Sequence, residues 1–272
     1  MKRHFLAIFL LILFSFSCLY TSASAICVSA KHAILLDAVT GDVLFEKDAD
    51  VQTPMASTTK IATAIAVIEA LPLDTVVAIP KEAVGVEGTS AYFKEGETLS
   101  VCDLLHALLL SSANDAAVAL AIACDGDISS FAARMNRLAS DLSLTNTHFE
   151  NPHGLPSDDH YTTARELALI SAYAMSNPAF AEIVGKRSYT CRSSEAVRVF
   201  RNHNKLLSFS SDAIGVKTGF TKKSGRCLVG AAEKDGARLI SVTLSAPNDW
   251  QDHLSLFQYG FSLIGVSDTE TH

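Results

Sequence analysis

The chain has 272 residues, a hydrophobic content of 49% and a formal net charge of −7 at pH 7. This length and composition suffice to bury a large core, and they favour one big domain. A mildly acidic chain without basic clusters argues against a nucleic-acid partner and against electrostatic docking on anionic lipid.

The N-terminus has the pattern of an export signal. Lys2 and Arg3 precede an apolar run over residues 5–16, and Ala23-Ser24-Ala25 follows. A basic start, an apolar run too short to span a bilayer comfortably and a small-residue cleavage site are typical of a signal peptide. We therefore expect residues 1–25 to be a signal peptide. The protein would be exported, either secreted or held at the membrane by an uncleaved signal, and no other segment resembles a transmembrane helix.

The five cysteines outside the expected signal peptide predict neither a zinc site nor a disulfide framework. They are odd in number, widely spaced and without a Cys-x-x-Cys pair. They are Cys27, Cys102, Cys124, Cys191 and Cys227. The histidines form no metal-ligand spacing either, so we predict no metal and no cofactor, and we leave disulfide pairing open.

Two short strand-like runs open the expected mature chain. Ala33–Asp37 and Asp42–Glu46 flank a turn that contains Gly41, which predicts a β-hairpin. The run from Ser57 to Leu71 follows and is apolar on nearly every face, so it predicts a helix buried in the middle of the domain. A serine at its start, with a proline just upstream, marks the expected beginning of that helix.

Ser57 and Lys60 lie three residues apart, which places them on the same side of the expected first turn. A hydroxyl and an amine held together at the positive end of a buried helix suit a nucleophile whose proton the amine removes. The pair alone does not establish a site, because Ser-x-x-Lys occurs about once by chance in a chain this long.

Residues 99–180 have a helical pattern. Ser100-x-x-Asp103 resembles a capping box at a helix start, and Thr163-x-x-Glu166 is expected to cap another helix. The expected helices are Leu104–Leu110, Asp115–Ala123, Ser129–Leu142 and one that Thr163 caps and that ends at Met175. A polar stretch from Lys186 to Asn204, to which we assign no element, follows.

The C-terminal part returns to strands. The expected elements are three strands, Ala213–Gly219, Arg226–Ala232 and Ala237–Leu244, and a helix, Asp249–Leu263. The whole pattern predicts an α+β fold. An antiparallel sheet from the N-terminal and C-terminal strands would be flanked by helices, with a mostly helical insertion at about residues 75–200. We expect one domain over residues 26–268 and no second C-terminal domain.

Two further motifs accompany the Ser57 pair. Ser112-Ala113-Asn114 lies in a break between expected helices, where both polar residues could simply cap the next helix. Lys217-Thr218-Gly219 ends an expected strand. In the order Ser-x-x-Lys, Ser-x-Asn and Lys-Thr-Gly, the three motifs resemble the signature of penicillin-recognising serine enzymes.

The residues around the motifs narrow the resemblance to low-molecular-mass penicillin-binding proteins, the serine-type D-alanyl-D-alanine carboxypeptidases. The stretches that carry it are Pro54–Lys60, Ser112–Ala116, His148–Leu155 and Gly215–Thr221, and it covers roughly residues 28–265. The resemblance implies a serine β-lactamase/DD-peptidase-like fold. It also implies removal of the terminal D-alanine from peptidoglycan stem peptides, with β-lactams as covalent inhibitors.

The resemblance implies catalytic roles for three side chains. Ser57 would be the acyl nucleophile, Lys60 its general base, and Ser112 a proton relay to the departing D-alanine. Burial and the nearby charge of Lys217 would both lower the pKa of Lys60, which is the direction that a base requires.

The resemblance also implies substrate-binding residues. Asn114 would hydrogen-bond the substrate backbone, and Lys217 and Thr218 would bind its terminal carboxylate. Gly219, without a side chain, would let its strand approach the nucleophile closely. The backbone N–H of Phe220 would form an oxyanion hole with that of the nucleophile.

The chain departs from some relatives in the expected carboxylate site. Those relatives carry an arginine after the last strand, but residues 245–250 contain none. His203 stands where other relatives have an arginine, and it could donate weakly to a carboxylate or be a surface histidine. His153 is expected to order a turn beside the site.

Two alternatives remain open. A class A serine β-lactamase would need a glutamate to activate the deacylating water, and the nearest candidate, Glu150, lacks the expected surrounding pattern. A non-hydrolytic module that binds cell-wall peptide or senses β-lactam would keep the fold without turnover.

Overall fold

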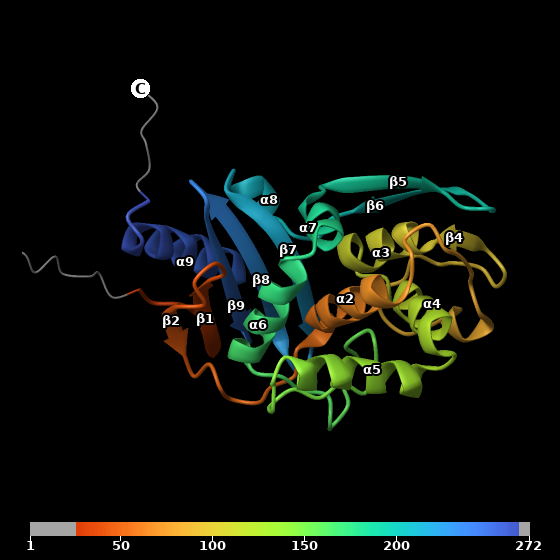
Figure 1. Ribbon diagram of the computed structural model, residues 1–272, viewed down its shortest axis with the longest axis horizontal. Coiled ribbons are helices and arrows are strands. Elements are labelled where there is room, and N and C mark those ends of the chain that lie inside the picture. The colour runs from red at the N-terminus through yellow and green to blue at the C-terminus, as the bar shows by residue number, and fades with distance from the viewer. Residues whose placement is uncertain (1–25, 267–272) are drawn as a thin grey trace, which may run out of the picture.

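The computed structural model describes residues 26–266, and the predicted signal peptide lies outside these residues. Figure 1 shows a central β-sheet with one long helix on one side and a block of helices on the other. In spatial order the sheet contains β2 (Val43–Lys47), β1 (His32–Asp37), β9 (Ala237–Leu244), β8 (Gly225–Lys234) and β7 (Ala213–Thr221).

The sheet joins the two ends of the described chain. Each neighbouring pair of strands in it is antiparallel, and β1 lies between β2 and β9. The register places Ile34 of β1 opposite Val242 of β9. The predicted α+β architecture, with a sheet built from N-terminal and C-terminal strands, is confirmed.

Side chains of β1 alternate between two hydrophobic cores. Ile34 and Leu36 belong to the core shared with the helical block, whereas Ala33 and Leu35 belong to the core under α9 (Asp249–Leu263). Successive residues of a strand point to opposite faces, so this alternation buries both faces of the sheet. The sheet is thereby packed firmly between the two groups of helices.

The helical block has α2 at its centre. Its helices are α2 (Lys60–Ala70), α3 (Val101–Leu110), α4 (Asn114–Asp125), α5 (Ile128–Asp141), α6 (Ala164–Met175) and α7 (Pro178–Gly185). α2 contacts each of the other five, and its residues from Lys60 to Val67 are all buried. A helix that is apolar on nearly every face can be enclosed in this way. Both predicted caps form, because the side chains of Ser100 and Thr163 each accept from the backbone N–H of the third residue of their helix.

The polar stretch to which the sequence assigned no element contains a hairpin, β5 (Ser188–Arg192) and β6 (Val197–Arg201). Its inward side chains, such as Cys191 and Phe200, are few, so the period-two pattern is weak in the sequence. Arg198 of β6 forms an ion pair with Glu97 at 2.7 Å, and this carboxylate is completely buried. The hairpin is therefore held in place by a tertiary contact.

Four smaller elements lie between the larger ones. They are the paired strands β3 (Val76–Ala78) and β4 (Thr98–Ser100), the 3-10 helix η2 (Lys81–Ala83) and the short helix α8 (Leu206–Phe209). In the sheet, β7 continues to Thr221, which pairs with Gly225. The prediction that Lys217-Thr218-Gly219 ends its strand is therefore wrong, because pairing with β8 extends beyond the motif.

All five cysteines within residues 26–266 are free thiols. No single helix in the same range is both long enough and apolar enough to cross a membrane.

Gly230 of β8 has no room for a side chain. An added Cβ would lie 2.6 Å from His253 Nδ1 and 2.9 Å from Leu206 Cδ1. His253 is held in place, because its ring nitrogens bond Ser241 Oγ and Thr243 Oγ1 at 2.6 and 2.9 Å. We predict that Gly230→Ala lowers the free energy of unfolding by about 1–3 kcal/mol, as measured by urea denaturation.

Gly185→Ala is the matched control for this prediction. A Cβ at Gly185 would meet Ile214 O at 3.5 Å, an ordinary van der Waals distance. The free energy of unfolding should therefore change much less than for Gly230→Ala. Equal losses in the two variants would contradict the steric argument.

Candidate active site

Ser57 lies in a tight turn that precedes the long helix. The prediction that the helix begins at Ser57 is wrong, because the 3-10 segment η1 (Ala56–Thr59) comes first and α2 begins at Lys60. The hydroxyls of Thr58 and Thr59 donate to the carbonyl oxygens of residues 55 and 56. Such side-chain bonds compete with helical backbone bonds, which explains the tighter turn.

The side chain of Lys60 is fully buried and its amine has three partners. Nζ donates to Ser57 Oγ at 3.1 Å, to Asn114 Oδ1 at 2.7 Å and to the backbone oxygen of His153 at 2.6 Å. Three acceptors match the three protons of an ammonium group. The amine is therefore fixed in position against the hydroxyl of Ser57.

The electrostatics of the site favour neutral amines. Burial, and after it the charge of Lys217, hold the pKa of Lys60 well below its ordinary value, while Asp115 acts in the opposite direction. Burial alone lowers the pKa of Lys217 to about 7. Because desolvation penalises the charged form of a lysine, both side chains can lose a proton far more readily than a lysine in water.

Ser112 and Asn114 do not cap α4. The N-cap residue is Ala113, which makes no side-chain capping bond, so the capping interpretation of this motif is wrong. Asn114 is buried beside Lys60, and its Nδ2 donates to Glu87 O at 2.6 Å. Ser112, with a φ of 61°, lies instead at the surface of the cleft that contains Ser57.

β7 lies directly against the turn that carries Ser57. A Cβ on Gly219 would be 3.1 Å from the backbone nitrogens of both Ser57 and Thr58, so a side chain here would push the strand away. Lys217 is buried on the same strand and donates to Thr218 O at 3.0 Å. β7 is also the last strand of the sheet, and within residues 26–266 no other strand pairs with its outer edge.

A loop that follows α5 supports the turn from the other side. Gly154 has a φ of +87°, and an added Cβ would lie 1.9 Å from the carbonyl oxygen of residue 56. His160 Nδ1 accepts from Glu150 N, so its Nε2 carries the proton and donates to Thr59 Oγ1 at 2.8 Å. The expected turn residue His153 contributes its carbonyl to Lys60, whereas sequence analysis assigned no role to His160.

The cleft beside Ser57 has a volume of about 320 Å³. The residues that line it are Ser57, Thr89, Ser112, His203, Thr218, Gly219, Phe220, Arg226, Asp249 and Trp250. Of the other predicted site residues, Lys60, Asn114 and Lys217 lie buried behind this surface. Sequence analysis missed Arg226 and Asp249, because neither belongs to a motif and their proximity depends on the fold.

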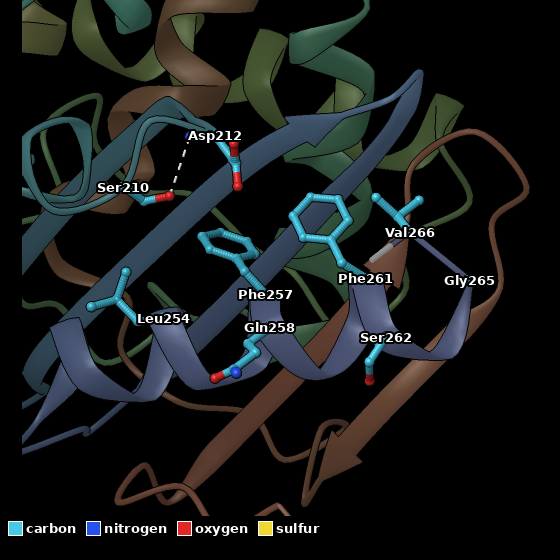
Figure 2. A pocket seen from close by; sticks show the side chains of 9 residues that line it. All are labelled: Ser210, Asp212, Leu254, Phe257, Gln258, Phe261, Ser262, Gly265 and Val266. Atoms are coloured by element: carbon cyan, nitrogen blue, oxygen red, sulfur yellow. Dashed lines mark hydrogen bonds between the residues drawn. The ribbon is translucent and has the colours of Figure 1, made fainter. Parts of the chain in front are cut away.

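A second cavity of about 440 Å³ lies beside α9, as Figure 2 shows. Leu254, Phe257 and Phe261 of that helix line it together with Ser210 and Asp212. None of the predicted site residues lines this cavity. The cleft at Ser57 is therefore the candidate active site.

A sheet enclosed by helices, with a serine, two lysines and a second serine around one cleft, is the arrangement of penicillin-recognising serine enzymes. Within that class, the chain belongs to the D-alanyl-D-alanine carboxypeptidase family, whose family model matches residues 20–248. The resemblance predicted from the three motifs is confirmed.

Curated relatives have the same description. The D-alanyl-D-alanine carboxypeptidase of Streptomyces sp. strain K15 is 35% identical and covers 87% of this chain and 88% of its own length. DacB2 of Mycobacterium tuberculosis strain H37Rv is 34% identical, and the match covers 86% of this chain and 83% of that relative. DacF of Bacillus subtilis strain 168 is 31% identical over 80% of this chain, which spans 57% of that longer relative.

Solved structures agree with the fold. The Streptomyces K15 DD-transpeptidase has a TM-score of 0.82 at 33% identity, covering 88% of this chain and 99% of its own. An evolved penicillin-binding protein homologue from Mycobacterium tuberculosis has a TM-score of 0.84 at 32% identity. The match covers 89% of this chain and 95% of that one. The predicted serine β-lactamase/DD-peptidase-like fold is confirmed.

The buried Lys217 should make stability depend on pH in a defined direction. Its pKa is about 7 in the folded protein, below that of an unfolded lysine, so the unfolded state binds more protons between these values. Lys217 should therefore make the free energy of unfolding increase as the pH rises from 7 to 9. We predict that Lys217→Met reduces the slope of unfolding free energy against pH by about 1 kcal/mol per pH unit.

The measurement is urea denaturation at several pH values in this window. Lys81→Met, at an exposed position, controls for the loss of one positive charge. An unchanged slope in Lys217→Met would contradict the assignment of a depressed pKa to this residue.

Proposed function

We propose that this chain is a serine-type carboxypeptidase that removes the terminal D-alanine from peptidoglycan stem peptides through an acyl-enzyme on Ser57. Membership in the D-alanyl-D-alanine carboxypeptidase family supplies the reaction class. The observation that carries the residue assignment is the 3.1 Å contact between Lys60 Nζ and Ser57 Oγ, in a buried setting that lowers the pKa of the amine.

In the acylation step, neutral Lys60 takes the Oγ proton while Ser57 Oγ bonds to the carbonyl carbon of the penultimate D-alanine. The carbonyl electron pair moves onto its oxygen. The N–H groups of Ser57 and Phe220 would stabilise this oxyanion. The close approach at Gly219 supports the assignment, because it brings β7 within reach of the Ser57 nitrogen.

The peptide C–N bond then breaks, and the departing D-alanine amine needs a proton. Ser112 lies on the cleft wall and would relay one from the Lys60 ammonium group. A water molecule next adds to the ester, which frees Ser57 and the shortened peptide. A β-lactam would acylate the same oxygen, but its leaving amine stays tethered, so that adduct should be long-lived.

Asn114 acts in this scheme by positioning Lys60. Its Oδ1 accepts from the amine at 2.7 Å and its Nδ2 is held by Glu87 O, so the amide is fixed at both ends. The predicted bond from Asn114 to the substrate backbone stays a prediction, since the residue lies behind the cleft surface.

The outer edge of β7 suits an extended peptide. Backbone groups on an unpaired sheet edge can bond an added strand, which gives affinity without a deep pocket. Lys217 and Thr218 would place the peptide terminus at this edge. The substrate would be a stem peptide ending in D-Ala-D-Ala, reached outside the cytoplasm after export directed by residues 1–25.

One observation weighs against the class A β-lactamase alternative. Glu150 is exposed, accepts a hydrogen bond from Ser157 Oγ and does not line the cleft. It is therefore not placed to activate a water molecule at the acyl-enzyme.

The first test is release of D-alanine from an acyl-D-Ala-D-Ala peptide. Ser57→Ala removes the nucleophile, so we predict that the release rate falls by about 10³-fold or more. Ser111→Ala, which changes a neighbouring serine outside the cleft lining, is the control and should retain activity. Measuring penicillin turnover in the same preparations separates the alternatives.

Rapid hydrolysis of penicillin without D-alanine release would identify a β-lactamase. Labelling of Ser57 by penicillin without turnover of either compound would favour the binding module. Both outcomes would contradict the carboxypeptidase assignment.

A second test addresses Lys60 as the base. Asn114→Asp would place a carboxylate against the Lys60 amine, which stabilises the ammonium form and raises the pKa of the lysine. We predict that the acid limb of kcat/KM against pH moves to higher pH, with activity partly recovered in alkaline buffer. A uniform loss of kcat at all pH values would contradict a proton-accepting role for Lys60.

A further inference from the structure

We infer that Arg226 binds the terminal carboxylate of the substrate. This inference rests on the proposed function and deepens it by naming a residue that recognises the substrate. Residues 245–250 lack the arginine expected after the last strand, so another group must bind the carboxylate. Arg226 belongs instead to β8, the neighbour of β7 in the sheet, and it reaches the same cleft as Ser57.

The register of the sheet places Arg226 beside the Lys-Thr-Gly motif. Arg226 is directly opposite Phe220, and Leu228 is directly opposite Thr218. Alternate residues of paired strands share a face, so Thr218, Phe220 and Arg226 project from the same side of the sheet. Thr218 and Arg226 are diagonal neighbours, about 7–8 Å apart, which a long side chain can bridge. A carboxylate at the Thr218 hydroxyl therefore lies within reach of the guanidinium group.

Arg226 is the residue of the cleft lining whose positive charge does not depend on pH. Lys217 lies behind the cleft surface, its pKa is lowered to about 7, and its amine already donates to Thr218 O. Burial, and then the charge of Lys217, lower the pKa of His203, which is therefore mostly neutral at pH 7. Arginine remains protonated at every relevant pH, so Arg226 is the one dependable cation among the described residues that line the cleft.

The guanidinium group is held in place by the first turn of α9. Nη2 lies 2.9 Å from Asp249 Oδ1, and the guanidinium carbon lies 5.8 Å from the ring centroid of Trp250. The Asp249 side chain is only 4% exposed, whereas that of Arg226 is 44% exposed. An arginine has five N–H donors in a planar fork, so one aspartate partner leaves donors for a second carboxylate. The N-terminus of α9 also offsets part of the Asp249 charge.

The test compares two substrates that differ in one group. kcat/KM is measured for acyl-D-Ala-D-Ala and for the same peptide with a neutral C-terminal amide. Arg226→Gln should lower kcat/KM for the free carboxylate by about 10- to 100-fold, as expected for a hydrogen-bonded charge pair, and leave the amide nearly unchanged. Arg226→Lys keeps the charge but loses the fork, so its effect should be intermediate. Acylation by a penicillin and by its methyl ester provides the same comparison without turnover.

Removal of Arg226 leaves the Asp249 carboxylate buried without its cation, so a loss of stability must be separated from a loss of recognition. The double variant Arg226→Gln with Asp249→Asn removes both charges, and it should regain thermal stability without regaining carboxylate preference. Arg238→Gln is the matched control, because this arginine forms a surface ion pair with Glu233 and does not line the cleft. It should keep the wild-type preference.

An unchanged carboxylate preference in Arg226→Gln would overturn the inference, and D-alanine release that depends on Ser57 would still support the proposed function. If His203→Gln, and not Arg226→Gln, loses the preference for the free carboxylate over the amide, the histidine binds the carboxylate. That result would also overturn the inference. If the wild-type protein releases no D-alanine, the proposed function fails. Equal acylation of wild type and Arg226→Gln by penicillin would then overturn the inference separately.

Discussion

Two buried lysine amines, brought to the junction between the sheet and the helical block, are the constraint on which the rest of the structure depends. An isolated ammonium group is costly to remove from water. At Lys60 this cost is only partly offset by three acceptors, which come from its own turn, from α4 and from the loop at His153, so the pKa of the amine stays lowered. Since these segments are distant in the sequence, the amine acquires its full environment only in the folded chain.

The architecture follows from holding the turn that carries Ser57 at a fixed place. α2 anchors it at the centre of the helical block, and β7 presses against it where Gly219 leaves room. Gly154 permits the same close approach from the opposite side. The sheet can serve as a firm support because both of its faces are buried, one by the helical block and one by α9. A reactive geometry is thus built from parts that have little freedom to move.

The sequence predicted those features whose causes are local. The β1–β2 hairpin, the caps at Ser100 and Thr163 and the three motifs each depend on residues close together in the chain. The features it missed depend on distant partners. The β5–β6 hairpin relies on the buried ion pair of Arg198 with Glu97. Arg226 lines the cleft only because the fold brings α9 and β7 together around it. Spacing along the chain could not reveal either of these contacts.

The open edge of β7 has a consequence for how the protein avoids self-association. An exposed strand edge is a template on which another chain can add, and natural proteins usually protect such edges. The proposed peptide site requires this edge to stay unpaired, so charged blocking residues or a covering strand would abolish access. Thr89, Ser112 and His203 line the same cleft as Thr218 and Gly219 of β7, so side chains from outside the sheet lie close to this edge. A single extended chain needs less room beside this edge than the edge of a second folded sheet, which brings its own neighbouring strands and side chains with it.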